Sequence, residues 1–169
     1  SELHYKKRNY YILTSLENQI SSITNVSGIT SSNVDITEFN SLENPVTRRA
    51  GADLTFAMDG NTVDVDYLPF YGIALLAGRN FIRDDQPDAI LISRFAATRL
   101  GFKLPEDAIG SRINLYLQVG NWKDAEIIGV FENFRIDSFL NMSQSSTEAT
   151  DEGRGVILMY KSHQFDDVI

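Results

Sequence analysis

The sequence predicts a domain of the α+β class, in which helices and strands are mixed within one fold. The clearest observation is the alternation of apolar and polar residues over Ile113–Val119, which indicates a strand with one buried face. Gly120 and Asn121 then supply a tight turn, and Ala125–Phe131 follows as a second strand, so the two strands should pair as a hairpin. A helical period of apolar residues from Tyr10 onward indicates an amphipathic helix near the N-terminus.

Composition places the chain among ordinary globular proteins and excludes several functions. Its 169 residues, 43% apolar and 22% charged, fit a single domain over residues 1–169. The net charge of -8 excludes a nucleic-acid binder, because no basic stripe is present to neutralise phosphates. Without cysteine there is no disulfide, no thiolate nucleophile and no cysteine metal site. No apolar run reaches the length of a membrane span.

In chain order, the N-terminal helix should fade near Thr24, and Asp35–Arg49 should be a loop. Two alternating runs follow, Ala52–Ala57 and Thr62–Tyr67. Asp59–Asn61 reads Asp-Gly-Asn, a strong turn signal, so these two runs are expected to form a β-hairpin.

The stretch Val63–Phe81 is predicted to be the packing nucleus of the domain. It begins as a strand, passes through a short helical turn at Phe70–Ile73 and ends at a glycine corner, Gly78, where only glycine would easily take the backbone angle. Arg79 is its only long cation. A stretch of this kind favours packing over reactive chemistry.

The second half should contain a buried strand at Ala89–Ile92 and a helix that is capped by Ser93 and ends at Gly101. The polar run Asn141–Gly155 is predicted to be a mobile loop. A final buried strand is expected at Val156–Tyr160.

Few residues suit catalysis or metal binding. His4 and His163 are the only imidazoles, and no nucleophile or zinc motif accompanies them. Asp64 and Asp66 could form a glycosidase-like carboxylate pair, although two solvent-facing strand residues are the simpler interpretation. The aspartates of the loop at 83–88 lack the spacing of a calcium loop.

A group of aromatic side chains could form a partner-binding patch, although core packing is favoured for most of them. The group comprises Trp122, Phe131, Phe134 and Phe139.

Several ordered blocks of the sequence resemble the MacB-like periplasmic domain of ABC transporter permeases of the MacB/FtsX type. The blocks are Tyr67–Ile73 with Leu76–Phe81, then Ala89–Gly101, Ala108–Ile113 and Ile127–Phe134. The residues that carry this structural signature are Tyr67, Gly72, Gly78, Arg79, Phe81, Gly110, Gly129 and Phe134. The family is recognised by packing motifs, so the resemblance implies no catalytic, cofactor-binding or metal-binding residues and no cofactor. The length of the Asn141–Gly155 run departs from the family pattern.

The resemblance also implies an architecture. It implies a two-lobed extracytoplasmic domain, with a strand at Val26–Val34 after the N-terminal helix. A membrane-proximal lobe would contain that helix and the Val156 strand, and an inserted β-rich lobe would span about Val63–Phe131.

The function implied is that of a non-catalytic module that couples transmembrane movement to an external client. Its partners would be the transmembrane helices of the same permease chain, a separate ABC ATPase subunit or domain and an unidentified client. The permease would lie in the bacterial inner membrane, with this domain in the periplasm or outside the cell. The alternatives are a ligand-binding sensor or adaptor without transport, and a carboxylate-dependent hydrolase. Apolar spans flanking this stretch in the full-length gene would favour the permease.

Overall fold

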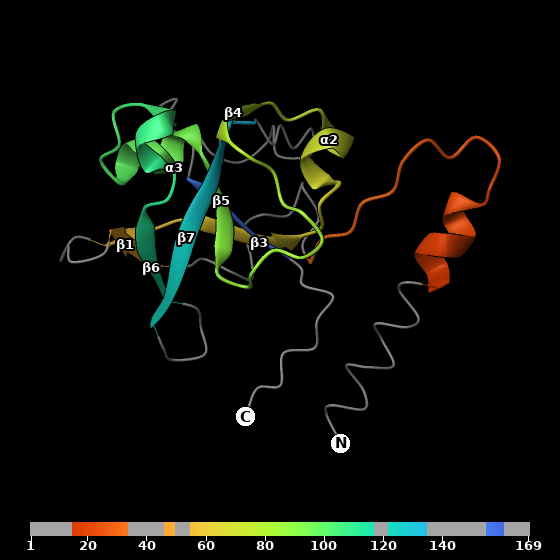
Figure 1. Ribbon diagram of the computed structural model, residues 1–169, viewed down its shortest axis with the longest axis horizontal. Coiled ribbons are helices and arrows are strands. Elements are labelled where there is room, and N and C mark those ends of the chain that lie inside the picture. Colours follow the sequence, from red (N-terminus) through yellow and green to blue (C-terminus); the bar gives the residue numbers. More distant parts are fainter. Residues whose placement is uncertain (1–14, 34–45, 50–54, 117–121, 135–154, 161–169) are drawn as a thin grey trace, which may run out of the picture.

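The computed structural model describes residues 15–33, 46–49, 55–116, 122–134 and 155–160 (Figure 1). The strands are β1 (Val46–Arg49), β2 (Phe56–Ala57), β3 (Asp59–Val63), β4 (Leu75–Gly78), β5 (Ala89–Ser93), β6 (Arg112–Tyr116), β7 (Trp122–Phe131) and β8 (Val156–Tyr160). The helices are α2 (Tyr67–Tyr71), α3 (Arg94–Arg99) and the 3-10 helix η1 (Pro105–Ala108), and residues 15–21 are also helical. Helices and strands are therefore mixed in an α+β fold, as predicted.

One mixed, eight-stranded sheet organises the domain. Its order is β2-β1-β6-β7-β5-β8-β3, and β4 pairs with β7 outside this path. The predicted hairpin is confirmed, because β6 and β7 are antiparallel, with Tyr116 opposite Trp122 and Arg112 opposite Glu126. Farther along β7, β5 occupies one edge and β4 continues the edge that β6 occupies at the start of the strand.

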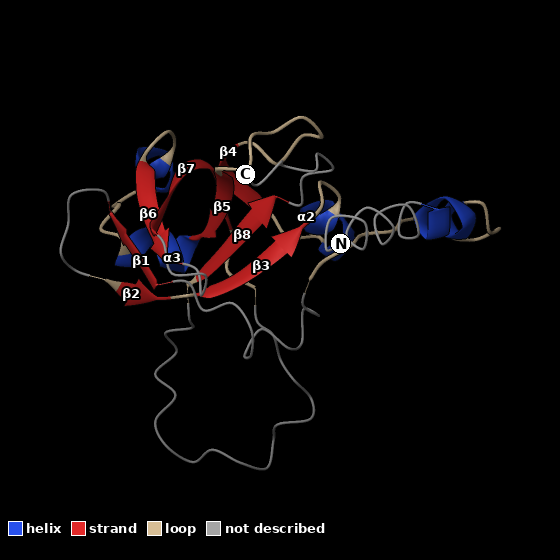
Figure 2. Cartoon of the chain, turned by 90° about the horizontal axis from the view of Figure 1, so that it is seen from below, coloured by secondary structure: helices blue, strands red, loops and turns tan. Residues whose placement is uncertain are grey.

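The predicted hairpin around Asp59–Asn61 is wrong. These residues lie inside β3, which pairs with β8 in parallel, with Asp59 opposite Val156 and Val63 opposite Tyr160 (Figure 2). Asn61 is fully buried. Asp-Gly-Asn is a turn signal only when local preference decides, and here pairing with a distant strand overrides it.

Other boundaries also differ from the sequence prediction. β2 pairs with β1, which occupies the end of the stretch expected to be a loop. β3 ends at Val63 and α2 begins at Tyr67, so the helical turn starts earlier than predicted. Residues 26–31 are irregular, and Ser32 forms only an isolated bridge to Val63 where a strand was implied.

The sheet carries a hydrophobic core on each face. Successive residues of β5 alternate between the two cores, with Ile90 and Ile92 in one and Leu91 in the other. The first core also contains residues of α3 and Ala108 of η1. The second contains residues of α2, together with Phe81, Phe131 and Tyr160.

The expected separation of the Val156 strand from the Val63–Phe131 unit is wrong. β8 lies between β3 and β5 and pairs with both, so it belongs to the same sheet as that unit. A second lobe is not evident in the described part of the chain. His4, Phe139, His163 and most of the 141–155 run lie outside the described residues, as do both termini.

Candidate functional site

Two of the signature residues, Gly78 and Gly129, lie opposite each other where β4 pairs with β7. Gly78 has a φ of +72°, so the backbone angle predicted there is confirmed. A Cβ at Gly78 would lie 2.2 Å from the Ile128 carbonyl oxygen and 2.7 Å from Ile109 Cδ1. Its partner across the two strands is Gly129, where a Cβ would lie 2.4 Å from the Arg79 carbonyl oxygen. The two glycines thus allow β4 to approach β7 more closely than any side chain would permit.

Arg79 forms a bidentate ion pair with Asp85. Its guanidinium donates hydrogen bonds of 2.8 and 2.6 Å to the two carboxylate oxygens, and the Ile82 N–H donates another of 2.8 Å. The side chain of Asp85 is only 5% exposed. Burial alone would raise the pKa of Asp85, but the hydrogen bonds from Arg79 and Ile82 outweigh it and hold that pKa below its usual value.

The ion pair makes stability depend on pH in a defined direction. The pKa of Asp85 is lower in the folded chain than in the unfolded chain. The ionised Asp85 therefore contributes fully to the free energy of unfolding above its unfolded-state pKa of about 4, and this contribution is lost as the pH falls through its folded-state pKa. We therefore expect the free energy of unfolding of the wild type to fall more steeply than that of Asp85→Asn between about pH 5 and about pH 2. Urea titrations across this range measure the two slopes, and Arg79→Met should flatten the slope as well. Equal slopes for the wild type and Asp85→Asn would contradict the assignment.

The loop that follows Arg79 is fixed to two other parts of the fold. The ring of Phe81 lies 5.4 Å from the ring of Tyr160, and the Tyr160 hydroxyl donates a 2.6 Å hydrogen bond to the Arg83 carbonyl oxygen. The side-chain amide of Asn80 donates to the Val65 carbonyl oxygen at 2.8 Å. These contacts connect the loop to β8 and to the segment that leads into α2.

The remaining signature residues lie at other points of the fold. Tyr67 is buried at the start of α2, and Gly72 ends that helix in a left-handed conformation. Gly110 donates its backbone N–H to the Ile127 carbonyl oxygen. Phe134 stacks on Phe131, with ring centroids 5.9 Å apart. The structure therefore gathers Gly78, Arg79 and Gly129 at one corner, and Gly110 lies near it because the adjacent Ile109 approaches Gly78. The other four signature residues belong to α2 and to the second core.

The aromatic residues divide between core and rim. Phe131 is fully buried and Phe134 is packed against the same core, which agrees with the predicted core role. Trp122 is 41% exposed and lies against Tyr116 at the end of the hairpin where β6 ends and β7 begins.

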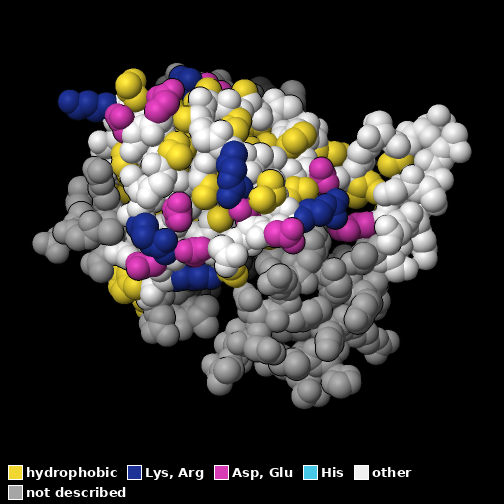
Figure 3. All heavy atoms as spheres, in the orientation of Figure 1, with side chains coloured by type: hydrophobic (Ala, Val, Ile, Leu, Met, Phe, Trp, Pro, Cys, Tyr) yellow, Lys and Arg dark blue, Asp and Glu magenta, His cyan; other side chains and the backbone are white. Residues whose placement is uncertain are grey.

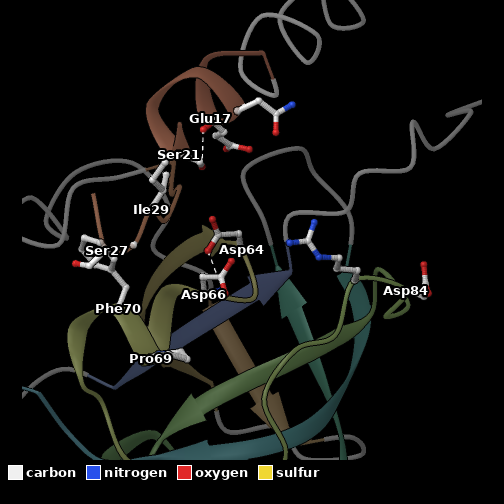
Figure 4. A pocket seen from close by; sticks show the side chains of 12 residues that line it. Glu17, Ser21, Ser27, Ile29, Asp64, Asp66, Pro69, Phe70 and Asp84 are labelled. Atoms are coloured by element: carbon white, nitrogen blue, oxygen red, sulfur yellow. Dashed lines mark hydrogen bonds between the residues drawn. The ribbon is translucent and has the colours of Figure 1, made fainter. Parts of the chain in front are cut away.

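A cavity of about 730 Å³ lies between the N-terminal helix and α2, and sequence reasoning did not anticipate it. Glu17 and Ser21 of the N-terminal helix line one side, and Asp64, Phe70 and Asp84 line the other (Figure 4). The residues that form it are far apart in the sequence, so no local motif could reveal it.

The two aspartates considered as a carboxylate pair both line this cavity. Asp64 accepts hydrogen bonds on both oxygens, from Thr30 and from Ser31, and is therefore engaged in structure. Asp66 is the N-cap residue of α2 and makes no side-chain capping bond. This arrangement gives the hydrolase alternative no support.

No metal-binding group of three or more His, Cys, Asp or Glu side chains occurs among the residues that the structure describes. In the loop at 83–88, Asp85 pairs with Arg79, and Asp88 lies 2.8 Å from Arg112. Within the same described ranges, no helix is long and apolar enough to cross a membrane. Figure 3 shows cationic and acidic side chains intermingled on one face, without the basic stripe that nucleic-acid binding requires.

Comparison with known proteins agrees with the fold and with the family resemblance. The model of the MacB-like periplasmic core domain matches residues 7–165. A domain assigned to a permease from Porphyromonas gingivalis has a TM-score of 0.53 and 18% identity, over 82% of this chain and 52% of that chain. The periplasmic region of MacB from Actinobacillus actinomycetemcomitans has a TM-score of 0.52 and 16% identity, over 92% and 66% of the two chains.

The extracellular domain of the ABC-type transporter YknZ from Gram-positive bacteria also has a TM-score of 0.52 and 16% identity, over 85% of this chain and 59% of that chain. This chain thus spans only 52 to 66% of the length of these solved chains, and at such identities the likeness shows the fold alone. No curated protein matches the sequence. Because the family match runs from residue 7 to residue 165, the chain belongs to the MacB-like periplasmic core domain family.

Proposed function

We propose that this domain couples movement of a permease's transmembrane helices to a client outside the cytoplasm. The family consists of periplasmic domains of MacB/FtsX-type permeases, which are non-catalytic components of transporters. The domain would be held at the bacterial inner membrane by transmembrane helices of the same chain, and a separate ABC ATPase subunit or domain would drive it. The domain itself would carry out no catalysis and would need no cofactor.

The observation that supports this role is the single sheet with a core on each face. β7 is bonded to three other strands, and β8 connects β5 to β3. A closely packed interior resists deformation, so a displacement applied at one point moves the whole body. This is the property that a mechanical coupling module requires.

Distances between spin labels in the full-length permease test this function. The domain contains no cysteine, so cysteines introduced at the exposed Lys103 and Lys123 are its only labelling sites. We expect the Lys103–Lys123 distance to remain the same in the nucleotide-free and ATP-bound states. The distance from Lys103 to paramagnetic labels on the lipid headgroups should change between the two states, because the domain moves as one body with the transmembrane helices.

The opposite pattern would contradict the proposal. A domain whose distance to the lipid headgroups stays constant throughout the ATP cycle does not follow the movement of the transmembrane helices. If, in addition, a small molecule raised the melting temperature of the chain, the sensor alternative would be favoured, because the cavity of about 730 Å³ has the size of a small-ligand site.

A further inference from the structure

In the part of the chain that the structure describes, the N-terminal helix is connected to the sheet with little apolar packing. Figure 1 shows this helix, in orange-red, standing away from the sheet and joined to it by an irregular segment. Leu16 and Ile23 are 48% and 57% exposed, and residues 21–28 are all exposed. The cavity described above separates the helix from α2 and from the loop at Arg83. Among the described residues, hydrophobic contact is therefore too sparse to fix the helix against the sheet.

Hydrogen bonds to the end of β3 provide a firm connection. The Thr30 hydroxyl donates to Asp64 Oδ1 at 2.7 Å, and the Ser31 N–H and hydroxyl donate to Asp64 Oδ2 at 2.6 and 3.0 Å. In return, the Asp64 N–H donates to the Ser31 carbonyl oxygen at 3.1 Å, and the Asn33 N–H donates to the Thr62 carbonyl oxygen at 2.9 Å. Hydrogen bonds to a charged carboxylate are stronger than bonds between neutral groups.

The same carboxylate also holds the beginning of α2. The Asp66 N–H donates to Asp64 Oδ1 at 3.1 Å. Asp64 is half-buried, so water competes less effectively for these bonds than it does at a fully exposed site. Three parts of the chain, the irregular segment, β3 and α2, thus meet at a single side chain.

We propose that Asp64 is the joint through which the N-terminal helix passes movement to the sheet. This inference rests on the proposed coupling function. A displacement of the helix would pull on Thr30 and Ser31, and Asp64 would pass it to β3. From β3 the backbone ladder leads to β8, then to β5 and β7. Asp64 acts as a positioning residue in this scheme and touches no client.

Asp64→Ala and its neighbour Asp66→Ala form a matched pair of variants. Both remove one carboxylate from the cavity wall, but Asp66 makes no capping bond, and its backbone N–H remains in the alanine variant. In Asp64→Ala we expect amide exchange of Ser31 and Asn33 to accelerate by about 10- to 100-fold, while amides of β5 and β7 keep their rates within about twofold. Asp66→Ala should exchange like the wild type. Hydrogen-exchange mass spectrometry on the 169-residue chain measures these rates.

A second variant guards against a general loss of folding. Thr30→Val keeps the shape of the side chain and removes one donor, so it should accelerate exchange at Ser31 to a smaller extent and leave the sheet unchanged. Unchanged exchange at Ser31 in Asp64→Ala would overturn the proposal. Acceleration in β5 and β7 equal to that at Ser31, in both Asp64→Ala and Thr30→Val, would overturn it as well, because the bonds would then support the whole fold.

Labels at Asn18 and Lys103 in the full-length permease test the transmission itself. The distance between them should be narrow and independent of nucleotide in the wild type and in Asp66→Ala. In Asp64→Ala it should become broad and change with ATP, because the helix would move without the sheet. A narrow, constant distance in Asp64→Ala would refute the joint, even where the domain as a whole follows the membrane helices. A domain that does not follow them in the wild type would refute the coupling function together with the joint.

Discussion

Gly78→Val is expected to cost about 3–5 kcal/mol of unfolding free energy, a large share of the stability of an ordinary domain. Two effects add at this position. A φ of +72° is strained for any β-branched residue, and the new Cβ would meet the Ile128 carbonyl oxygen at 2.2 Å. Since the near atom belongs to the backbone of β7, it cannot move aside without disturbing the sheet. Urea denaturation followed by circular dichroism measures the loss.

Gly72 supplies the matched control. It also has a positive φ, of +64°, but nothing lies within 4 Å of the Cβ that it would gain. Gly72→Ala should therefore cost only about 1–2 kcal/mol, from the left-handed backbone alone, and Gly78→Ala should cost clearly more. Equal losses in the two alanine variants would show that the approach of β4 to β7 is not limiting. In the permease, a Gly78 variant that still folds should uncouple export while leaving ATP hydrolysis largely intact.

Phe131→Ala is expected to destabilise the chain by about 3–5 kcal/mol. Phe131 is fully buried on β7 and stacks with Phe134, so truncation leaves a cavity that the surrounding strands cannot fill. Thermal unfolding should show a melting temperature lowered by about 6–20 °C.

Trp122 lies at the other end of the same strand and is the control for Phe131. Its ring is 41% exposed and touches Tyr116, so Trp122→Ala should cost only about 0.5–1.5 kcal/mol. A loss as large as that of Phe131→Ala would mean that the exposed start of β7 is as important to the core as its buried end.

The sequence predicts those elements whose pattern is local. Alternation around Gly120 locates β6 and β7, a continuous apolar run locates β5, and Ser93 caps α3 by accepting a hydrogen bond from the Ala96 N–H. At Gly78 and Gly72, the glycines stand where the backbone takes positive φ. In each case neighbouring residues contain the information, so their order along the chain is sufficient.

Features that depend on distant partners could not be read in this way. Asp59–Asn61 has the composition of a turn, yet it lies in a strand because β8, almost a hundred residues later, pairs with it. The role of Asp64 depends on Thr30 and Ser31, which have no sequence relation to it beyond being polar. The cavity likewise arises only when the N-terminal helix and α2 are placed in space.

The position of β8 has a consequence for how the domain is made. β8 lies between β3 and β5, although it is the last strand in the described chain, so neither neighbour has its full set of backbone partners until Val156–Tyr160 has left the ribosome. Until then the nascent sheet exposes two open edges, which are sites for pairing with other chains. The domain should therefore complete its folding late and slowly, since its closing contacts join residues far apart in sequence. A chain that stops before residue 156 should accumulate as an aggregation-prone intermediate.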